Sequence, residues 1–324
     1  MKQQNNIANP ITQVNVITSA RLHMGFFDLS GSKAPSYGSL GMSIDAPSTH
    51  IELAKNDITL IDTKSSENVA KIIENIVNYF NITQNFSLKI HESIPAHTGL
   101  GSGTQLALAI GAGLNQLFNL NLSHTDIAKL AKRGKRSGIG IAAFEQGGVL
   151  VDTGKTNDAL PKIALRHDFP DDWRVLLVND TAKTGVHGEA ELQAFQLLKP
   201  AQNSLRDMMF NHMMPALQRG DLLAFGAYMA DLQAYNGDYF APIQGGQYAS
   251  HDVADVLSDL QNQGVVCAGQ SSWGPSGFAV VGSLQQAQSL QKQVQLAFNH
   301  KPNICVQICK GKNTGASIQV KHSN

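Results

Sequence analysis

The sequence is poor in charge, in aromatic residues and in cysteine. Charged residues make up 15% of the 324 positions, aromatic residues make up 6%, and there are three cysteines. Lysine plus arginine and aspartate plus glutamate both number 25. This balance removes the excess of positive charge that draws proteins to nucleic acid or to anionic membranes. We therefore expect neither nucleic acid nor a membrane among the partners.

Long apolar runs are also missing. No run approaches the roughly 20 residues that a membrane-spanning helix needs. The first six residues, MKQQNN, are polar and lack the apolar segment of a secretory signal. The three cysteines, Cys267, Cys305 and Cys309, leave an odd count, and the last two lie four apart in an alternating segment. We interpret them as small hydrophobic residues on one strand face and predict a reducing, cytoplasmic location.

What is present is a hydrophobic fraction of 42% and a conspicuous glycine-rich loop, PAHTGLGSGT. Gly99, Gly101 and Gly103 lie two apart, so the backbone can adopt positive φ and approach a ligand closely. Residues 87–94 alternate as a strand does, and residues 104–118 predict a helix. A glycine loop that opens a helix presents unpaired N–H groups and the positive end of the helix dipole. This arrangement suits phosphate.

Other interpretations of the glycines are weaker or remain open. The loop has neither the lysine of a Walker A sequence nor the G-x-G-x-x-G spacing. A tight turn that only lets a helix pack on a strand is the structural alternative. Residues 138–143 match G-x-G-x-x-A, but they follow a basic, polar stretch and not a strand. We therefore do not interpret them as a dinucleotide site.

The hydrophobic pattern predicts a strand-rich first half and an α+β second half that resembles a split βαβ unit. The expected strands are residues 14–24, 50–54, 58–61, 87–94, 149–152, 173–178, 265–268, 278–281 and 303–309. The expected helices are residues 68–80, 104–118, a helix capped by Ser123, residues 188–198, residues 205–234 with a break near Gly220, and residues 253–263 and 284–298. Residues 1–12 look like a polar leader. Residues 161–172 look like a junction between domains 1–165 and 166–324.

Three passages occur in the order used by enzymes of the GHMP kinase superfamily. They are RLHMGFFD from Arg21, the glycine-rich loop at residues 95–104, and GQSSWGPSG from Gly269. A fourth passage, from Arg136 to Gly140, resembles the Ser-Gly-x-Asp segment of these kinases. The resemblance covers nearly the whole chain. It implies an α+β, GHMP kinase-like two-domain fold, with a ribosomal protein S5 domain 2-like N-terminal domain and a ferredoxin-like C-terminal domain.

The departures from the kinase pattern concern acidic groups. In the kinases the Ser-Gly-x-Asp segment carries an aspartate that helps to activate the substrate hydroxyl, and here Gly140 stands in its place. The kinases also carry a Mg²⁺-ligating glutamate before this segment, where this chain has Lys129, Lys132 and Arg133. An ATP-dependent small-molecule kinase is therefore the second interpretation. A phospholigand-binding protein without catalysis is the third.

The passages that begin at Ser19, Arg136 and Gly269 resemble those of a narrower family, the β-ribofuranosylaminobenzene 5'-phosphate synthases. The resemblance implies a phosphoribosyltransferase of methanopterin biosynthesis with coupled decarboxylation. Such an enzyme joins the ribose of phosphoribosyl pyrophosphate to 4-aminobenzoate or 4-hydroxybenzoate and releases CO₂ and pyrophosphate. It also implies a homodimer and Mg²⁺ bound through pyrophosphate oxygens.

The resemblance assigns candidate roles to three groups of residues. The predicted phosphate or pyrophosphate site is His97, Gly99, Gly101, Ser102, Gly103 and Thr104. The candidate Mg²⁺ ligands are Ser102, Thr104 and Glu145. The candidate catalytic residues are Arg21, His23 and Arg136, of which Arg21 and His23 would bind the benzoate carboxylate or a phosphate. Their alternatives are a structural ion pair for Arg21 and a satisfied strand histidine for His23.

A further group is expected to close the substrate pocket. It comprises Gln270, Ser271, Ser272, Trp273 and Gly274. Trp273 would stack on the aromatic acceptor, or it would pack beneath a turn. Lys132, Arg133, Lys135 and Arg136 could neutralise phosphate or form a solvated helix end that the helix dipole favours, and we favour the solvated interpretation for all but Arg136.

Overall fold

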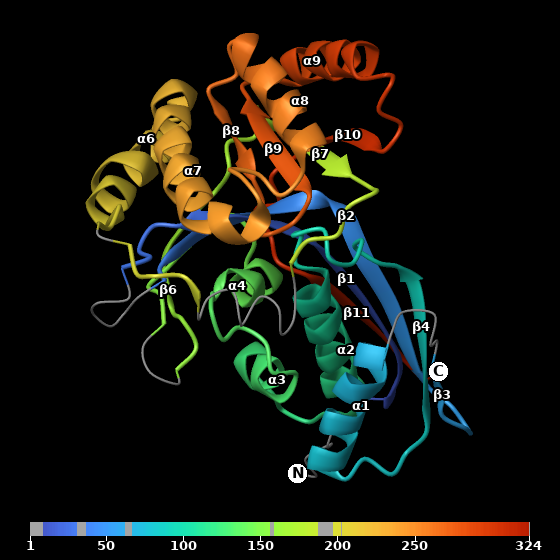
Figure 1. Ribbon diagram of the computed structural model, residues 1–324. Helices are drawn as coiled ribbons and strands as arrows, with labels where there is room; N and C mark the ends of the chain where they lie inside the picture. The colour runs from blue at the N-terminus through green and yellow to red at the C-terminus, as the bar shows by residue number, and fades with distance from the viewer. Residues whose placement is uncertain are drawn as a thin grey trace, which may run out of the picture.

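The computed structural model describes residues 9–30, 37–61, 67–155, 159–186, 197–201 and 203–323. These residues form two sheets, each covered by helices, and the two bodies pack against one another (Figure 1). Residues 1–8 of the predicted leader 1–12 and most of the helix predicted at residues 188–198 lie outside the described residues, whereas residues 11 and 12 already belong to the first strand.

The first sheet has seven strands and is built around two long ones. Its strands are β1 (Ile11–Phe26), β2 (Ser39–Lys55), β3 (Leu60–Ile61), β4 (Phe86–Glu92), β5 (Val149–Asp152), β6 (Ile163–His167) and β11 (Ser317–His322). The order is β11-β1-β2-β4-β3, and β5 pairs with β2 and β6. The strand nearest the end of the chain, β11, therefore lies beside the first strand, antiparallel to it.

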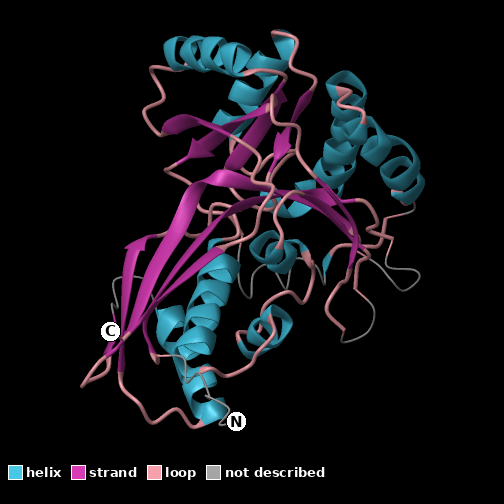
Figure 2. Ribbon diagram, turned by 180° about the vertical axis from the view of Figure 1, so that it is seen from behind, coloured by secondary structure: helices cyan, strands magenta, loops and turns pink. Residues whose placement is uncertain are grey.

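Four helices lie on one face of this sheet (Figures 1 and 2). They are α1 (Glu67–Phe80), α2 (Ser102–Phe118), α3 (His124–Leu130) and α4 (Ile139–Glu145). Helix α2 is the central one. A Cβ at Gly111 would lie 2.1 Å from Ile127 Cγ2, and one at Gly113 would lie 2.2 Å from Leu53 Cδ1. The glycines that weaken the intrinsic helix propensity thus let the helix pack closely between the sheet and α3.

The second sheet has the order β10-β7-β9-β8. Its strands are β7 (Arg174–Asp180), β8 (Cys267–Gln270), β9 (Ser276–Val281) and β10 (Ile304–Cys309). Helices α8 (His251–Asn262) and α9 (Leu284–Ala297) cover one face, where Val256, Leu260 and Val294 are buried. The remaining helices are η2 (Met208–Met213), α6 (Met214–Gln218) and α7 (Leu222–Gln244).

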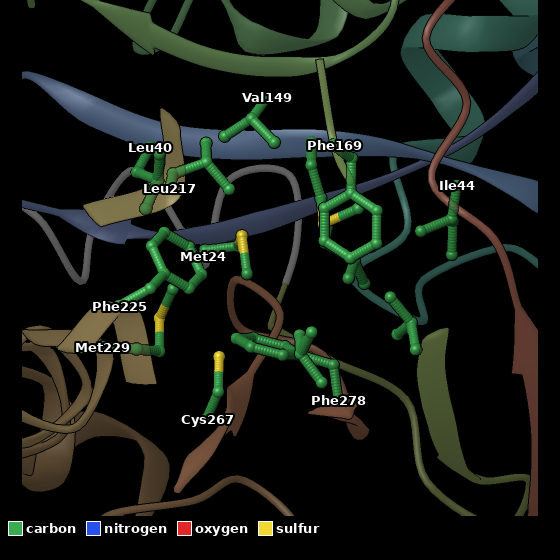
Figure 3. Packing of buried hydrophobic residues seen from close by; sticks show 14 of the residues in the cluster. Met24, Leu40, Ile44, Val149, Phe169, Leu217, Phe225, Met229, Cys267 and Phe278 are labelled. Atoms are coloured by element: carbon green, nitrogen blue, oxygen red, sulfur yellow. The ribbon is translucent and has the colours of Figure 1, made fainter. Parts of the chain in front are cut away.

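The largest apolar cluster joins the two bodies. Figure 3 shows Met24 and Leu40 from the first sheet facing Phe225 of α7 and Cys267 and Phe278 of the second sheet. These five side chains are at most 1% exposed. The two bodies therefore share one hydrophobic core, which fixes the end of β1 against α7 and β8.

Several elements differ from the sequence-based expectations. Strand β2 begins 11 residues before the predicted strand at 50–54, and β6 occupies part of the predicted junction, so the predicted boundary after residue 165 falls inside a strand. Helix α4 and strand β11 were not predicted. Cys309 is buried as expected, but Cys305 is exposed. In the described part of the chain, no helix is long and apolar enough to cross a membrane.

Candidate functional site

The glycine-rich loop ends at the N-terminus of α2, as the sequence predicts. Gly99 and Gly101 have φ of 84° and 81°, and Gly101 is the N-cap of the helix without a side chain to cap it. The N–H groups of Thr104 and Gln105 both donate to the Gly101 carbonyl oxygen. The N–H groups of Ser102 and Gly103 have no backbone acceptor among the described residues. The first turn of α2 thus offers free donors to an anion.

The loop touches the late glycine-rich passage backbone to backbone. A Cβ at Gly99 would lie 2.3 Å from the Ser271 carbonyl oxygen, and one at Gly274 would lie 2.0 Å from the Thr98 carbonyl oxygen. No side chain fits at either position, so the glycines of both passages are required for this contact. His97, with a φ of 60°, has an exposed side chain, and its carbonyl oxygen accepts a 2.7 Å hydrogen bond from Gly185 N–H.

Arg21 of β1 completes the contact from the first sheet. Its Nη1 donates a 2.7 Å hydrogen bond to the Gly99 carbonyl oxygen, which also accepts one of 2.8 Å from the Ser271 hydroxyl. The Arg21 side chain lies against Gly101, where a Cβ would be 3.0 Å from its Cγ and 3.1 Å from its Nε. The N-terminal passage, the loop and the late passage therefore meet at one carbonyl group.

Arg133, for which the solvated interpretation was preferred over phosphate neutralisation, lies beside the loop. Its guanidinium lies over the first turn of α2, where a Cβ at Gly103 would be 3.2 Å from Nη2. The Arg133 Nε is buried and has no hydrogen-bond partner in the described residues, and burial lowers the pKa of the guanidinium. Lys132 and Lys135 are exposed, as expected. The expectation of a solvated side chain is wrong for Arg133, because the left-handed backbone at Lys132 (φ 55°) and Gly134 (φ 81°) reverses the chain beside the loop.

The kinase-like segment also lies beside the loop. A Cβ at Gly140 would be 3.0 Å from Thr104 Cγ2. Gln105 links the two elements, because its Nε2 donates to the Gly140 carbonyl oxygen at 2.8 Å and its Oε1 accepts from the Thr18 hydroxyl at 2.5 Å. The position that holds the aspartate in kinases is therefore at the site, and here it carries no side chain.

A buried carboxylate holds the start of this segment. Asp152 accepts hydrogen bonds from the hydroxyls of Ser39 (2.7 Å) and Ser137 (2.9 Å) and from the N–H of Gly138 (2.8 Å). Burial raises the pKa of Asp152, and these hydrogen bonds oppose the rise. Asp152 fixes the residues that precede α4. The sequence does not predict this role, because an acidic residue at the end of a strand carries no distinctive signal.

His23 is buried next to two arginines. Burial, and then the charges of Arg21 and Arg136, lower the pKa of His23 to about 3, so its imidazole is neutral near pH 7. Arg21 and Arg136 are thus both close enough to His23 for their charges to act on it. His23 Nε2 has no hydrogen-bond partner among the described residues. A neutral imidazole offers a hydrogen bond and no charge, so it does not attract a carboxylate or phosphate as a cation would.

The late passage lines a small cavity next to His23. Gln270, Ser272 and Trp273 contribute to its walls, and its volume is about 30 Å³. The Trp273 side chain is 4% exposed and its ring centroid lies 4.4 Å from that of Phe240. Of the two arrangements left open for Trp273, packing beneath the turn is the one observed. The main chain of Ser271 and Gly274 contacts the loop, as described above.

The predicted Mg²⁺ ligands do not come together. Glu145 Oε1 lies 3.3 Å from His124 Nδ1 at the far end of α4. This end is about 7 Å along the helix from Gly140. Ser102 and Thr104 have hydroxyls without a hydrogen-bond partner in the described residues and remain suitable for contact with a cation. The described residues contain no group of three or more His, Cys, Asp or Glu arranged to hold a metal ion. The donor set therefore does not form a metal site held by the protein alone.

Two family models match the chain. The GHMP kinases N terminal domain matches residues 67–148, and the GHMP kinases C terminal model matches residues 213–300. Their boundaries include the loop and most of the helices of the second body. Together with the two sheets, they confirm the predicted GHMP kinase-like two-domain α+β fold.

The chain is also similar over most of its length to individual proteins. It is 32% identical to the beta-ribofuranosylphenol 5'-phosphate synthase of Methanocaldococcus jannaschii, over 81% of this chain and 88% of the relative. It is 30% identical to the protein of that name from Archaeoglobus fulgidus, over 94% of this chain and 98% of the relative. Among solved structures, the homoserine kinase of Cytophaga hutchinsonii has a TM-score of 0.66 at 17% identity, over 98% of this chain and 100% of that one. At that identity the likeness concerns the fold alone.

Proposed function

We propose a reaction for this chain on the premise that it belongs to the family of β-ribofuranosylphenol 5'-phosphate synthases, within the GHMP kinase superfamily. The chain is thus a synthase. We propose that it transfers the ribosyl group of phosphoribosyl pyrophosphate to a para-substituted benzoate and releases CO₂ and pyrophosphate. The relatives are named for a ribofuranosylphenol product, which favours 4-hydroxybenzoate as acceptor over 4-aminobenzoate.

In the proposed reaction one carbon–carbon bond forms and two bonds break. The broken bonds are the one from ribosyl C1 to pyrophosphate and the one from the ring to its carboxyl group, which leaves as CO₂. The bond between ribosyl C1 and the pyrophosphate oxygen breaks, and the electron pair leaves with pyrophosphate. The ring carbon that bears the carboxylate then bonds to ribosyl C1. Loss of CO₂ returns an electron pair to the ring and restores its aromaticity. The net exchange transfers no proton, so it needs charge stabilisation and alignment and no general base.

One observation carries this proposal: two guanidinium groups flank the first turn of α2. Arg21 lies against Gly101 and Arg133 lies against Gly103, above N–H groups that have no backbone acceptor. A leaving pyrophosphate gains negative charge as its bond to ribose breaks. Cations and helix N–H groups at this point stabilise the charge where it develops. The absence of a side chain at Gly140 fits a reaction that needs no base.

We propose that Mg²⁺ takes part as a complex with the pyrophosphate group. Ser102 and Thr104 would contact it through their hydroxyls, and water would supply most of its other ligands. When bound, the ion would neutralise part of the pyrophosphate charge. Glu145 has no part in this proposal because it is paired with His124.

We also propose a setting for the enzyme. The three cysteines are free, which agrees with a reducing cytoplasm. The product would serve the biosynthesis of a methanopterin-type cofactor, which the family resemblance implies. A homodimer remains a proposal taken from the resemblance.

The test is release of labelled CO₂ from carboxyl-labelled acceptor by the full-length protein. We expect release only when phosphoribosyl pyrophosphate and Mg²⁺ are both present, with pyrophosphate formed in equal amount. The kinase alternative predicts instead that ATP is converted to ADP with an alcohol acceptor. A protein that only binds a phospholigand would do neither and would gain thermal stability with phosphoribosyl pyrophosphate. Efficient phosphorylation of an alcohol without CO₂ release would reject the proposed reaction.

A further inference from the structure

A small cavity lies where the end of β1, helix α7 and the turn after β8 meet. It is partly open and has a volume of about 30 Å³. The residues that line it are His23, Gly25, Phe26, Gln233, Asn236, Gly237, Phe240, Gln244, Gln247, Gln270, Ser272 and Trp273. Among these described residues none is Asp, Glu, Lys or Arg, and the low pKa of His23 keeps its imidazole neutral near pH 7.

The amide side chains of the walls are engaged with the protein. Gln233 donates to the Met24 carbonyl oxygen at 2.5 Å and accepts from Gln270 N–H at 2.8 Å. Asn236 accepts from Phe26 N–H and donates to the Phe26 carbonyl oxygen, both at 2.8 Å. These bonds fix the walls. Four fully buried side-chain N or O atoms in the described residues lack a partner, and His23 Nε2 is the one that belongs to a lining residue.

The size of the cavity limits what can enter it. About 30 Å³ exceeds the 10–15 Å³ that one water requires, whereas a cavity that holds benzene measures about 150 Å³. The cavity therefore accepts a group of one or two heavy atoms and not an aromatic ring. A cation would lose its hydration without gaining a partner ion, because the lining residues carry no negative charge and the charges of Arg21 and Arg136 act on His23.

The cavity lies close to the phosphate loop. Arg21 and His23 are two residues apart on β1 and so share one face, about 7 Å apart along the strand. The Ser271 hydroxyl accepts from His23 N–H at 3.1 Å and donates to the Gly99 carbonyl oxygen at 2.8 Å. The Ser271 side chain thus connects His23, which lines the cavity, to Gly99 of the glycine-rich loop.

We propose that this cavity receives the para substituent of the benzoate acceptor and that His23 Nε2 forms a hydrogen bond with it. This inference rests on the proposed function. The ring lies at the mouth of the cavity, with its carboxyl-bearing carbon directed to the ribosyl donor at the loop. The site admits a hydroxyl or an amino group, which are neutral, have one heavy atom and form hydrogen bonds. It rejects a carboxylate, an aminomethyl cation or an acetamido group in the para position.

The test compares the affinities of 4-hydroxybenzoate and 4-methylbenzoate for the full-length protein by titration calorimetry, with inorganic pyrophosphate present. The two compounds have nearly the same size, and the methyl group cannot form the hydrogen bond. We expect 4-methylbenzoate to bind about tenfold more weakly, because it leaves His23 Nε2 buried and unpaired. 4-Carboxybenzoate and 4-acetamidobenzoate should bind more weakly still.

The variant His23→Leu separates this role from a general effect on the site. In this variant the preference for 4-hydroxybenzoate over 4-methylbenzoate should fall to within about twofold. In His91→Leu, which replaces a partly exposed histidine on β4, the wild-type preference should remain. A merely structural role of His23 would weaken both ligands equally and leave their ratio unchanged.

Equal affinity of the wild-type protein for the two compounds would overturn the inference. So would an unchanged ratio in His23→Leu, or no binding of either 4-hydroxybenzoate or 4-aminobenzoate. The labelled-CO₂ assay runs in parallel on the wild-type protein. CO₂ release together with any of these results removes the cavity assignment and leaves the reaction standing, whereas no CO₂ release with either acceptor removes the reaction itself.

Discussion

Arg133 is a cation that the fold desolvates without giving its Nε a partner in the described residues. A buried donor stabilises the folded state through the hydrogen bonds that it forms. Arg133 Nε forms none with the described residues, so it contributes little to stability. Its position over the first turn of α2 is instead suited to an anionic ligand. In Arg133 the requirements of binding and of folding are therefore separable.

We predict that Arg133→Met raises the KM for phosphoribosyl pyrophosphate by roughly 10- to 100-fold, the effect of losing charge-assisted hydrogen bonds. Its Tm should be equal to or above that of the wild-type protein, because a buried charge is replaced by an apolar side chain. Lys135→Met is the matched control, since Lys135 is an exposed cation of the same segment. Steady-state kinetics and thermal unfolding provide the two measurements. If Arg133→Met had the same KM for phosphoribosyl pyrophosphate as Lys135→Met, Arg133 would be excluded from the site.

His23 predicts a particular dependence of stability on pH. Its pKa is about 3 in the folded protein and 6.5 in the unfolded chain, so between these values the unfolded chain takes up a proton that the folded protein does not. Acidification through this window therefore favours unfolding. Between pH 7 and pH 5 the free energy of unfolding of the wild-type protein should fall by about 2 kcal/mol more than that of His23→Leu. Urea unfolding at both pH values measures the difference, and equal losses would contradict a neutral buried His23.

Residue types alone did not distinguish the neighbours in this segment. Lys132, Arg133 and Lys135 all look like a solvated basic end of a helix, and two of them are. Arg133 turns inward because the backbone at Lys132 and Gly134 is left-handed, and the pattern of hydrophobic residues does not predict such a conformation. His23 was singled out from the sequence, but its charge state depends on burial, on Arg21 and on Arg136, which is 113 positions later in the chain.

At the scale of the element, the loop before α2 approaches the late passage closely because Gly99 cannot hold a side chain. Gly99 has positive φ and a neighbouring carbonyl oxygen where a Cβ would be. Gly220 also has positive φ, of 68°, but nothing lies within 4 Å of its Cβ position. The two residues thus share a conformation and differ in packing.

We predict that Gly99→Ala destabilises the protein more than Gly220→Ala. Both substitutions cost about 1–2 kcal/mol for the left-handed backbone. Gly99→Ala also displaces Ser271 from the loop, so it should lower kcat/KM strongly, whereas Gly220→Ala should leave it nearly unchanged. Chemical denaturation and kinetics measure the two effects. Equal losses of stability with full activity in both variants would show that the contact with Ser271 is dispensable.

Elements with a regular apolar period were predicted well, and the others were missed for physical reasons. Helices α1, α8 and α9 each bury one stripe and lie within one or two residues of their expected bounds. The first half of β2 is buried on both faces and rich in small residues, so it does not alternate. Strand β11 is mostly exposed, and its apolar face consists of Ile318 and Val320 alone, which is too short a pattern to predict a strand.

At the scale of the whole molecule, the ordered motifs predicted the GHMP kinase-like fold, which is confirmed. The contact between Gly99 and Ser271 joins segments 172 positions apart, and no local pattern specifies it. The resemblance supplied the order of the passages, and the shared core between the two bodies supplies their proximity. The sequence therefore singled out the passages that meet at Gly99, but it did not reveal the inward turn of Arg133 or the hydrogen bonds of Asp152.

Deleting residues 317–324 should lower Tm by roughly 5 °C or more, because it exposes the edge of β1 and removes its antiparallel pairing with β11. The same deletion should reduce activity, since Arg21 and His23 lie farther along β1. Thermal unfolding and the labelled-CO₂ assay measure the two results. An unchanged Tm would mean that β11 adds nothing to the first sheet.

The pairing of β11 with β1 also has a consequence for synthesis on the ribosome. The strand that starts the first sheet leaves the exit tunnel long before its partner is translated. Until then one edge of β1 stays open to water, to chaperones or to neighbouring nascent chains. Catalytic competence should consequently appear only after residues 317–322 have left the exit tunnel, and messages cut short before these codons should yield protein that is degraded or aggregates.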